Sequence, residues 1–290
     1  MYAITGITGR VGGAAARALL GRGESIRAIV RSTDKGKVWS EKGCDVALAA
    51  IDDAQALTKA FAGADGVFLM TPPNFDPEPG FPQTRKILDA VSTAIKAARP
   101  GRVVFLSTVG AQANQENLLT NATIMEEGLR ALSVPMTLLR PAWFMENFTW
   151  DVAAARSGHL PSYLQPLDHP IPMIATADIG AVVADLLQQT WTGTRIIELE
   201  APRRYSAKDL GRAFAETIGR QVQVEPVPRD TWETTFRSQG MKHPMPRIRM
   251  IDGFNEGWID FEGGAAEHRT GQTPLEAIIR DLVRSADPEA

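Results

Sequence analysis

The chain has 290 residues, 44% of them hydrophobic and 22% charged, and its formal net charge is −3 at pH 7. This length suits one large domain, or a main domain with a smaller lobe, and the weak negative charge gives no general attraction for nucleic acid. The single cysteine, Cys44, excludes an internal disulfide and is typical of a reducing compartment. No apolar run approaches the roughly 20 residues of a membrane-spanning helix. No signal-peptide pattern precedes the first strand, so we expect a cytoplasmic protein that binds neither a membrane nor, directly, nucleic acid.

The first predicted strand, residues 2–5, runs into three glycines and then into a helix. A tight turn needs Gly6, the close approach of a pyrophosphate needs Gly9, and close packing of the helix on the sheet needs Gly12. The helix N-terminus adds free N–H groups and the positive end of a dipole. We therefore expect a dinucleotide to bind here, contacted by Gly6, Thr8, Gly9, Arg10, Val11 and Gly12. A glycine-rich turn without a ligand is the alternative.

Strand and helix patterns then alternate along the chain. Nearly continuous apolar runs are typical of parallel strands covered on both faces, and they predict strands at residues 2–5, 25–30, 45–49, 66–70, 102–107 and 136–140. Helical spacing of apolar residues predicts helices at residues 11–19 and near 54–62, 81–99 and 116–132. The alternation indicates an α/β fold of the Rossmann type, with a doubly wound parallel sheet.

The end of the second strand bears on which dinucleotide binds. NAD sites usually place an Asp or Glu there, whereas this strand ends at Arg31, with Lys35 and Lys37 just beyond. A guanidinium forms a bidentate, charge-assisted contact with a 2′-phosphate. Asp34 is predicted to lie in a turn, as a capping residue. The pattern therefore favours NADP(H) as the cofactor, and a solvated basic turn is the alternative.

The other strand ends are expected to line the same crevice, because ligands of such sheets bind outside the carboxyl ends of the strands. Hydroxyl groups at these ends suit contacts with the ribose or the nicotinamide. The residues predicted to line the crevice are Asp52, Met70, Thr71, Ser107, Thr108 and Pro141.

The pattern changes after Arg140. Residues 141–177 are rich in proline and aromatic residues, and elements are predicted beyond them at 178–190, 195–199, 206–218 and 222–227. We expect an NADP-binding core over residues 1–150 and a smaller substrate lobe over residues 151–290, with 178–200 returning to the core. Residues 285–290 are expected to fray.

Two segments are candidates for binding the substrate. The segment containing Trp143, Phe144 and Asn147 is predicted to form an apolar, planar pocket beside the nicotinamide. A hydrophobic seam between the two lobes is the alternative. The proline-rich loop over residues 71–82 is predicted to act as a lid.

These motifs resemble those of the NmrA-like family, a group of atypical short-chain dehydrogenases. The resemblance covers almost the whole chain, and it is carried by Thr5–Gly12, Ile29–Arg31, Phe105–Gly110, Leu138–Asn147 and Asp178–Gly180. It implies a Rossmann core, NADP(H) binding and activities that range from the reduction of quinones or other small molecules to redox sensing.

The chemistry of short-chain dehydrogenases carries over less well. They generally use Tyr-x-x-x-Lys, in which the lysine lowers the pKa of the tyrosine. Here Tyr2, Tyr163 and Tyr205 are followed four residues later by Gly6, Leu167 and Asp209. No histidine shows metal-ligand spacing, although His159 and His169 flank the irregular stretch and are candidate proton donors. No catalytic residue and no metal ligand is therefore assigned, and the oligomeric state stays open.

The sequence favours an oxidoreductase that transfers hydride from NADPH to a small apolar acceptor, quinone-like or carbonyl. The alternative is a non-catalytic NADP(H) sensor that acts through a protein partner.

Overall fold

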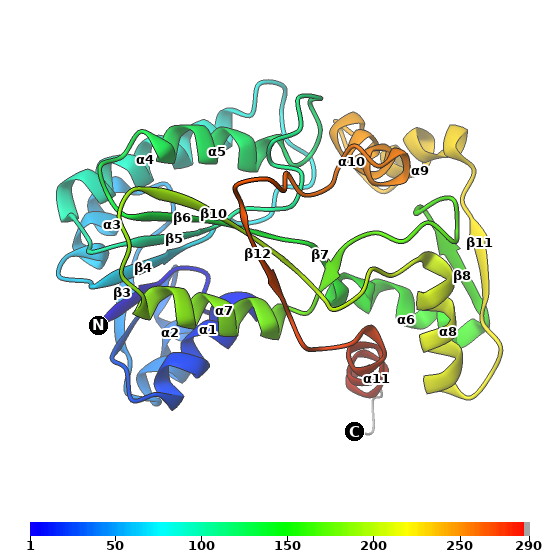
Figure 1. Cartoon of the computed structure of the whole chain (residues 1–290), viewed down its shortest axis with the longest axis horizontal. Coiled ribbons are helices and arrows are strands. Elements are labelled where there is room, and N and C mark those ends of the chain that lie inside the picture. Colours follow the sequence, from blue (N-terminus) through cyan, green and yellow to red (C-terminus); the bar gives the residue numbers. More distant parts are fainter. Residues whose placement is uncertain (287–290) are drawn as a thin grey trace.

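The molecule is organised around one parallel sheet, described here from a computed structural model that covers residues 1–286. The sheet has 8 strands in the order β12-β10-β6-β5-β4-β1-β2-β3, and every neighbouring pair is parallel (Figure 1). The strands are β1 (Tyr2–Ile4), β2 (Ile26–Val30), β3 (Asp45–Leu48), β4 (Gly66–Leu69), β5 (Val103–Leu106), β6 (Met136–Pro141), β10 (Thr194–Glu200) and β12 (Glu267–Thr270).

Helices cover both faces of the sheet, and alternate strand residues point to opposite faces. Ile4 packs in the cluster with α1 (Arg10–Gly21), α2 (Thr33–Ser40) and α7 (Thr176–Gln188), whereas Ala3 packs in the cluster with α3 (Ala54–Phe61), α4 (Pro82–Ala98) and α5 (Thr120–Arg130). Figure 1 shows these two helical layers on either side of the sheet.

Close packing of α7 on α1 depends on a glycine from one of the motifs. A Cβ on Gly180 would lie 2.4 Å from the Cβ of Ala14 and 2.7 Å from the backbone nitrogen of Ala15. Only glycine lets the two helices approach this closely. The contact fixes α7 beside the helix that follows the glycine loop.

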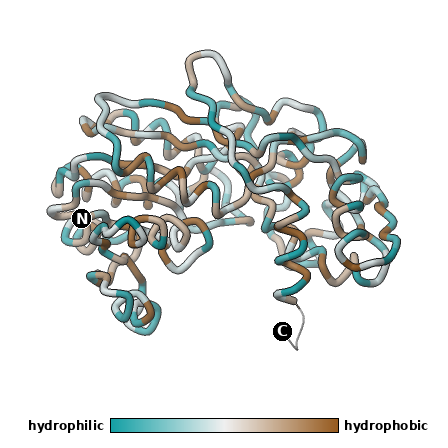
Figure 2. The backbone as a smooth tube through the Cα atoms, turned by 60° about the horizontal axis from the view of Figure 1, so that its bottom comes forward, coloured by the Kyte–Doolittle hydropathy of each residue, from teal (hydrophilic) through white to brown (hydrophobic). Residues whose placement is uncertain are grey.

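The remaining elements gather beyond one end of the sheet. Most of them surround a second hydrophobic core, which includes Phe148, Leu160, Phe214, Phe254 and Leu275. They include two small parallel sheets, β8 with β11 and β7 with β9. Their bounds are β7 (Trp143–Phe144), η1 (Met145–Asp151), α6 (Val152–Ser157), β8 (His159–Ser162), β9 (Met173–Ile174), α8 (Ala207–Ile218), β11 (Gln223–Pro226), η2 (Arg229–Thr231), α9 (Trp232–Ser238), α10 (Met245–Glu256) and α11 (Leu275–Ser285). Hydrophobic and hydrophilic segments alternate along these elements, as expected where one side of each is buried (Figure 2).

The predicted Rossmann-type sheet is confirmed, and the predicted strands and helices lie within a few residues of their observed positions. Two local predictions were wrong. The basic segment after Arg31 is not a turn but the helix α2, which places Asp34 in its first turn and leaves Ser32 as the N-cap. The stretch 141–177 is not irregular throughout, since it contains β7, η1, α6, β8 and β9.

The chain returns to the main sheet after residue 150 more than once. Helix α7 and strand β10 do so, and so does β12, which pairs with β10 at the edge of the sheet. The domain boundary at residue 150 stays a prediction. Of the residues expected to fray, 287–290 lie outside the described part.

None of the helices within residues 1–286 is both long and apolar enough to cross a membrane.

Candidate functional site

The glycine loop lies at the point where the strand order reverses. Strand β1 is flanked by β4 on one side and by β2 on the other, so the loop after β1 emerges between two connections that leave in opposite directions. In such sheets this crevice, outside the carboxyl ends of the strands, is where ligands bind. Thr5 joins the two strand ends, because its hydroxyl accepts a hydrogen bond from the backbone N–H of Met70 at 2.8 Å.

Each of the three glycines faces different surroundings. Gly6 has φ +60°, and a Cβ there would lie 2.2 Å from the sulfur of Met70. A Cβ on Gly12 would lie 2.4 Å from the carbonyl oxygen of Gly6, so Gly12 is required by the loop itself rather than by the sheet. A Cβ on Gly9 would meet only that same oxygen, at 3.2 Å. Apart from this one tight contact, no heavy atom of residues 1–286 beyond the two chain neighbours lies within 4 Å of a Cβ on Gly9.

The N-terminus of α1 has the properties of an anion site. Its N-cap is Gly9, which has no side chain to cap the helix, and the first turn contains no acidic residue. Thr8, Gly9 and Arg10 are exposed, whereas the side chain of Val11 is buried and leaves only its backbone for a ligand. Uncapped N–H groups at an exposed helix start attract phosphate oxygens.

A second cationic group of side chains lies at the end of β2. Arg31 and Lys35 are both exposed, and neither forms an ion pair within residues 1–286. Ser32 is the N-cap of α2, and its hydroxyl makes no capping hydrogen bond. The sequence reasoning missed Ser32, although a serine directly before Thr-Asp is a common start of a helix.

The predicted residues at the other strand ends differ in how free their side chains are. Thr71 and Thr108 are half-buried, and Met70 packs over Gly6. Asp52 is exposed and forms an ion pair with Lys86 at 2.7 Å. The carbonyl of Pro141 accepts a hydrogen bond from the backbone N–H of Val109 at 2.9 Å. All of these residues lie at the carboxyl ends of the strands of the main sheet.

Ser107 takes part in a buried ionic network instead of facing the crevice freely. Its hydroxyl donates to Glu126 at 2.5 Å, and Glu126 accepts two hydrogen bonds from Arg140, at 2.8 and 2.7 Å. Arg140 also donates to Glu262 at 2.6 Å. Burial alone would raise the pKa of Glu126, but Arg140 holds it below its usual range. The network fixes the ends of β5 and β6, and the arginine within the apolar run Leu138–Pro141 was its only signal in the sequence.

The three predicted pocket residues point in different directions. Trp143 packs with the second core, where its ring meets Phe254 edge-on at 5.2 Å, whereas Phe144 packs against the core of the main sheet. Adjacent residues of a strand alternate in this way. Both rings are partly exposed, and Asn147 on η1 is exposed. Trp143 therefore lies on the side of the second core and Phe144 on the side of the sheet.

The proline-rich loop is tied to the C-terminal part of the chain. The Asp76 carboxylate accepts hydrogen bonds from the backbone N–H groups of Lys242 at 2.9 Å and His243 at 2.6 Å, just before α10. Burial alone would raise the pKa of Asp76, but these bonds hold it below its usual range. The loop thus spans from β4 to α10, and its role as a lid stays a prediction.

The histidines lie elsewhere. His159 is on β8 with its Nδ1 3.9 Å from Glu225, and His169 is in a loop where its backbone N–H donates to Pro166. Within residues 1–286, no group of three or more His, Cys, Asp or Glu side chains is placed to hold a metal ion.

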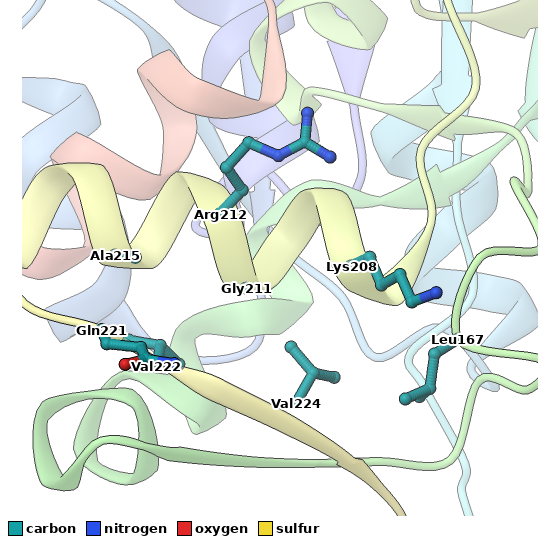
Figure 3. A pocket seen from close by; sticks show the side chains of 8 residues that line it. All are labelled: Leu167, Lys208, Gly211, Arg212, Ala215, Gln221, Val222 and Val224. Carbon is teal, nitrogen blue, oxygen red and sulfur yellow. The ribbon is translucent and has the colours of Figure 1, made fainter.

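A shallow pocket of about 320 Å³ lies between α8 and β11 (Figure 3). It is lined by Lys208 and Arg212 over an apolar floor that includes Val224. Lys208 is 3.4 Å from Asp168 and Arg212 is 3.6 Å from Asp209, so both cations already have anionic neighbours. None of its lining residues belongs to the glycine loop or to the strand ends.

Similarity to known proteins extends over most of the chain. A reductase of Streptomyces griseus, "(4-alkanoyl-5-oxo-2,5-dihydrofuran-3-yl)methyl phosphate reductase", is 27% identical over 248 residues, 85% of this chain and 83% of that protein. Quinone oxidoreductase 2 of Escherichia coli is 25% identical over 243 residues, 83% of this chain and 82% of that protein. The crystal structure of an NADPH-dependent quinone oxidoreductase from Escherichia coli, complexed with NADPH, has a TM-score of 0.79 at 23% identity, covering 97% of this chain and 99% of that one.

The match to the NmrA-like family extends over residues 2–257 and includes the glycine loop, all strand ends of the crevice and α10. This range confirms the family expected from the motifs. The chain belongs to the NmrA-like family.

Proposed function

We propose that the chain is an NADPH-dependent reductase that transfers hydride to a small, apolar, quinone-like or carbonyl acceptor. The observation that carries this proposal is the glycine loop: it lies at the switch point of the sheet, with only the carbonyl oxygen of Gly6 near a Cβ on Gly9 and an uncapped helix behind it. This combination suits the pyrophosphate of a dinucleotide. The relatives, a quinone oxidoreductase and a reductase of a phosphate ester, support a small-molecule reductase.

The cofactor contacts follow from the exposed groups. The N–H groups of Arg10, Val11 and Gly12 bind the pyrophosphate, Gly9 lets it approach the backbone, and Thr8 adds a hydroxyl. Arg31 and Lys35 bind the 2′-phosphate, with the Ser32 hydroxyl and the start of α2. The residues proposed along the rest of the cofactor are Asp52, Met70, Thr71, Thr108 and Pro141, with Ser107 acting through its backbone only.

The protein's part in the reaction is to position NADPH and the acceptor next to each other and to enclose them. NADPH supplies the hydride when bound. Trp143 contacts the acceptor from the side of the second core and Phe144 bounds the same space from the side of the sheet, so that water is excluded from an apolar space. A quinone suits a site without a Tyr-x-x-x-Lys pair, because its reduced oxyanion is a weak base that water can protonate.

Steady-state oxidation of NADPH with a panel of quinones and aldehydes tests this function. We expect turnover with at least one acceptor, and we expect Trp143→Ala to lose turnover while it keeps its affinity for NADPH. Trp150→Ala is the matched control, because Trp150 lies on η1 and is 86% exposed. Equal turnover by the Trp143→Ala variant and the wild type would remove Trp143 from the acceptor site.

A second candidate is a redox sensor that does not turn over. The absence of a Tyr-x-x-x-Lys pair in the sequence favours it. A sensor binds NADP⁺ and NADPH with different affinities and passes the difference to a protein partner. If no acceptor in the panel is reduced, yet calorimetry gives clearly different affinities for the two forms, the sensor replaces the reductase.

A further inference from the structure

Arg247 on α10 is a half-buried guanidinium without a carboxylate partner within residues 1–286. Its guanidinium carbon lies 4.3 Å from the ring centre of Phe236, and the sulfur of Met241, at 4.0 Å, is its one hydrogen-bond contact. By contrast, Arg229 forms two bonds of 2.6 Å with Asp252 of the same helix. Burial lowers the pKa of Arg247, and Tyr163 opposes that effect. A cation without a counter-charge in such a position is costly unless a ligand supplies one.

Only Nη1 of the Arg247 guanidinium has a hydrogen-bond contact within residues 1–286, so Nε and Nη2 have none. The buried, unpaired side-chain polar atoms within residues 1–286 belong to Gln112, Trp143 and Trp191, and none belongs to Arg247. Asp151 influences the pKa of Tyr163, but no carboxylate within residues 1–286 forms an ion pair with Arg247. The fork of the guanidinium is therefore free to bind an anion.

The face of α10 that bears Arg247 leads to the proposed acceptor site. Phe254 follows Arg247 by seven residues, which places both on one side of the helix about 10 Å apart along its axis. Phe254 contacts the ring of Trp143 at 5.2 Å. Met250 lies between them. It packs with the second core and also with a smaller cluster formed by Trp232, Phe236, Ile248 and Ile251. One side of α10 thus has the Arg247 cation at one end, the contact of Phe254 with Trp143 at the other, and an apolar side chain between them.

We propose that Arg247 binds an anionic substituent of the acceptor, a carboxylate, sulfonate or phosphate, while the apolar body of the acceptor lies over the half-buried Met250 toward Trp143. A guanidinium matches the oxygens of these groups with two parallel, charge-assisted hydrogen bonds. The inference rests on the proposed function for the reaction, and it names the class of acceptor that this function serves.

Binding without turnover gives the first test. The probes are naphthalene sulfonate, naphthoate and naphthyl phosphate, with naphthalene methanol as the neutral analogue, titrated by calorimetry into the protein loaded with NADP⁺. We expect at least one anionic probe to bind more tightly than the neutral one. Arg247→Gln is expected to weaken that probe about tenfold or more, and Arg247→Lys to retain part of the affinity.

Arg249→Gln is the matched control, because Arg249 is exposed on the same helix and its removal changes the net charge equally. We expect this variant to bind the probes like the wild type. An unchanged thermal midpoint in Arg247→Gln shows that the variant folds. Equal affinities of the wild type and Arg247→Gln, or no preference of the wild type for any anionic probe, would overturn the inference.

A matched pair of acceptors separates this inference from the proposed function. The pair is a naphthoquinone and the same naphthoquinone with one ring sulfonate. In Arg247→Gln we expect KM to rise about tenfold or more for the sulfonate only, with the neutral quinone unaffected. If neither quinone is reduced but Arg247→Gln loses the anionic probe, the reductase fails and the anion site stands. If both are reduced and both KM values stay constant, the reductase stands and the role of Arg247 fails.

Discussion

At the scale of single residues, the side chain at the end of β2 is the one proposed to set the preference for NADP(H) over NAD(H). Arg31 directly follows β2, is exposed and forms no ion pair within residues 1–286. A carboxylate at this place would repel a 2′-phosphate, whereas a guanidinium attracts it. Helix α2 begins at Thr33, directly after Arg31 and Ser32. The N–H groups of its first turn therefore add to the attraction of Arg31 for a 2′-phosphate.

Arg31→Ala tests this role. A charge-assisted hydrogen bond contributes roughly 1.5–3 kcal/mol, so we expect the affinity for NADPH to fall about tenfold to a hundredfold while the affinity for NADH barely moves. Calorimetric titration of both cofactors measures the two affinities. Lys96→Ala, an exposed cation on α4 at the other face of the sheet, controls for the change in net charge. Equal losses for NADH and NADPH would contradict contact with the 2′-phosphate.

At the scale of elements, the loop between β1 and α1 contains one glycine expected to be needed for cofactor binding, Gly9, and one needed for folding, Gly12. A Cβ at Gly9 would meet only the carbonyl oxygen of Gly6, at 3.2 Å, on the side where the pyrophosphate is expected, whereas a Cβ at Gly12 would lie 2.4 Å from that oxygen. Gly9 has φ −91° and ψ 177°, an extended conformation that valine adopts without strain. The two glycines therefore make different predictions.

We expect Gly9→Val to abolish NADPH binding and to leave the stability of the cofactor-free protein nearly unchanged. Gly12→Ala is expected to lower the free energy of unfolding by about 1–3 kcal/mol, because the backbone has to move to make room. Urea denaturation and cofactor titration of both variants measure the two effects. Normal NADPH binding by Gly9→Val would reduce the glycine loop to a simple turn.

Elements with strong local patterns were predictable from the sequence, and elements held by distant contacts were not. The strands of the main sheet can be recognised in the sequence as apolar runs. Helix α2 has few apolar residues, and it depends on the burial of Trp39 and Gly36. A Cβ on Gly36 would lie 2.6 Å from Val46 of β3, a contact that no local pattern contains. Strands β7 and β9 are two residues each and pair across about 30 positions, so their periodicity is too short to read.

The candidate site divides in the same way. The glycine loop and Arg31 are local signals, and the sequence was sufficient to find them. The partnership of Ser107 with Glu126 and Arg140, and the unpaired state of Arg247, arise only when distant segments meet. The sequence therefore predicts more of the proposed cofactor end of the site than of the proposed acceptor end.

On the scale of the whole molecule, one partly buried carboxyl, that of Asp151, couples the free energy of folding to pH. Burial raises the pKa of Asp151 from 3.8 to about 6, and its side chain has no ion pair or hydrogen bond within residues 1–286. Because the folded pKa lies above the unfolded one, the carboxyl favours folding most when it is protonated, below pH 3.8. That contribution is lost as the pH rises through about 6. At neutral pH the ionised form is thus a cost to the fold.

Asp151→Asn should remove this cost. A shift of about two pKa units corresponds to about 3 kcal/mol, which is the upper limit of the stabilisation expected for the variant near pH 8. The difference from the wild type should shrink as the pH falls through about 6 and vanish near pH 4. Urea denaturation at a series of pH values measures it, with Asp89→Asn, an exposed and unpaired carboxylate of α4, as the control. A difference that stays constant with pH would mean that burial of the Asp151 carboxyl does not govern its titration.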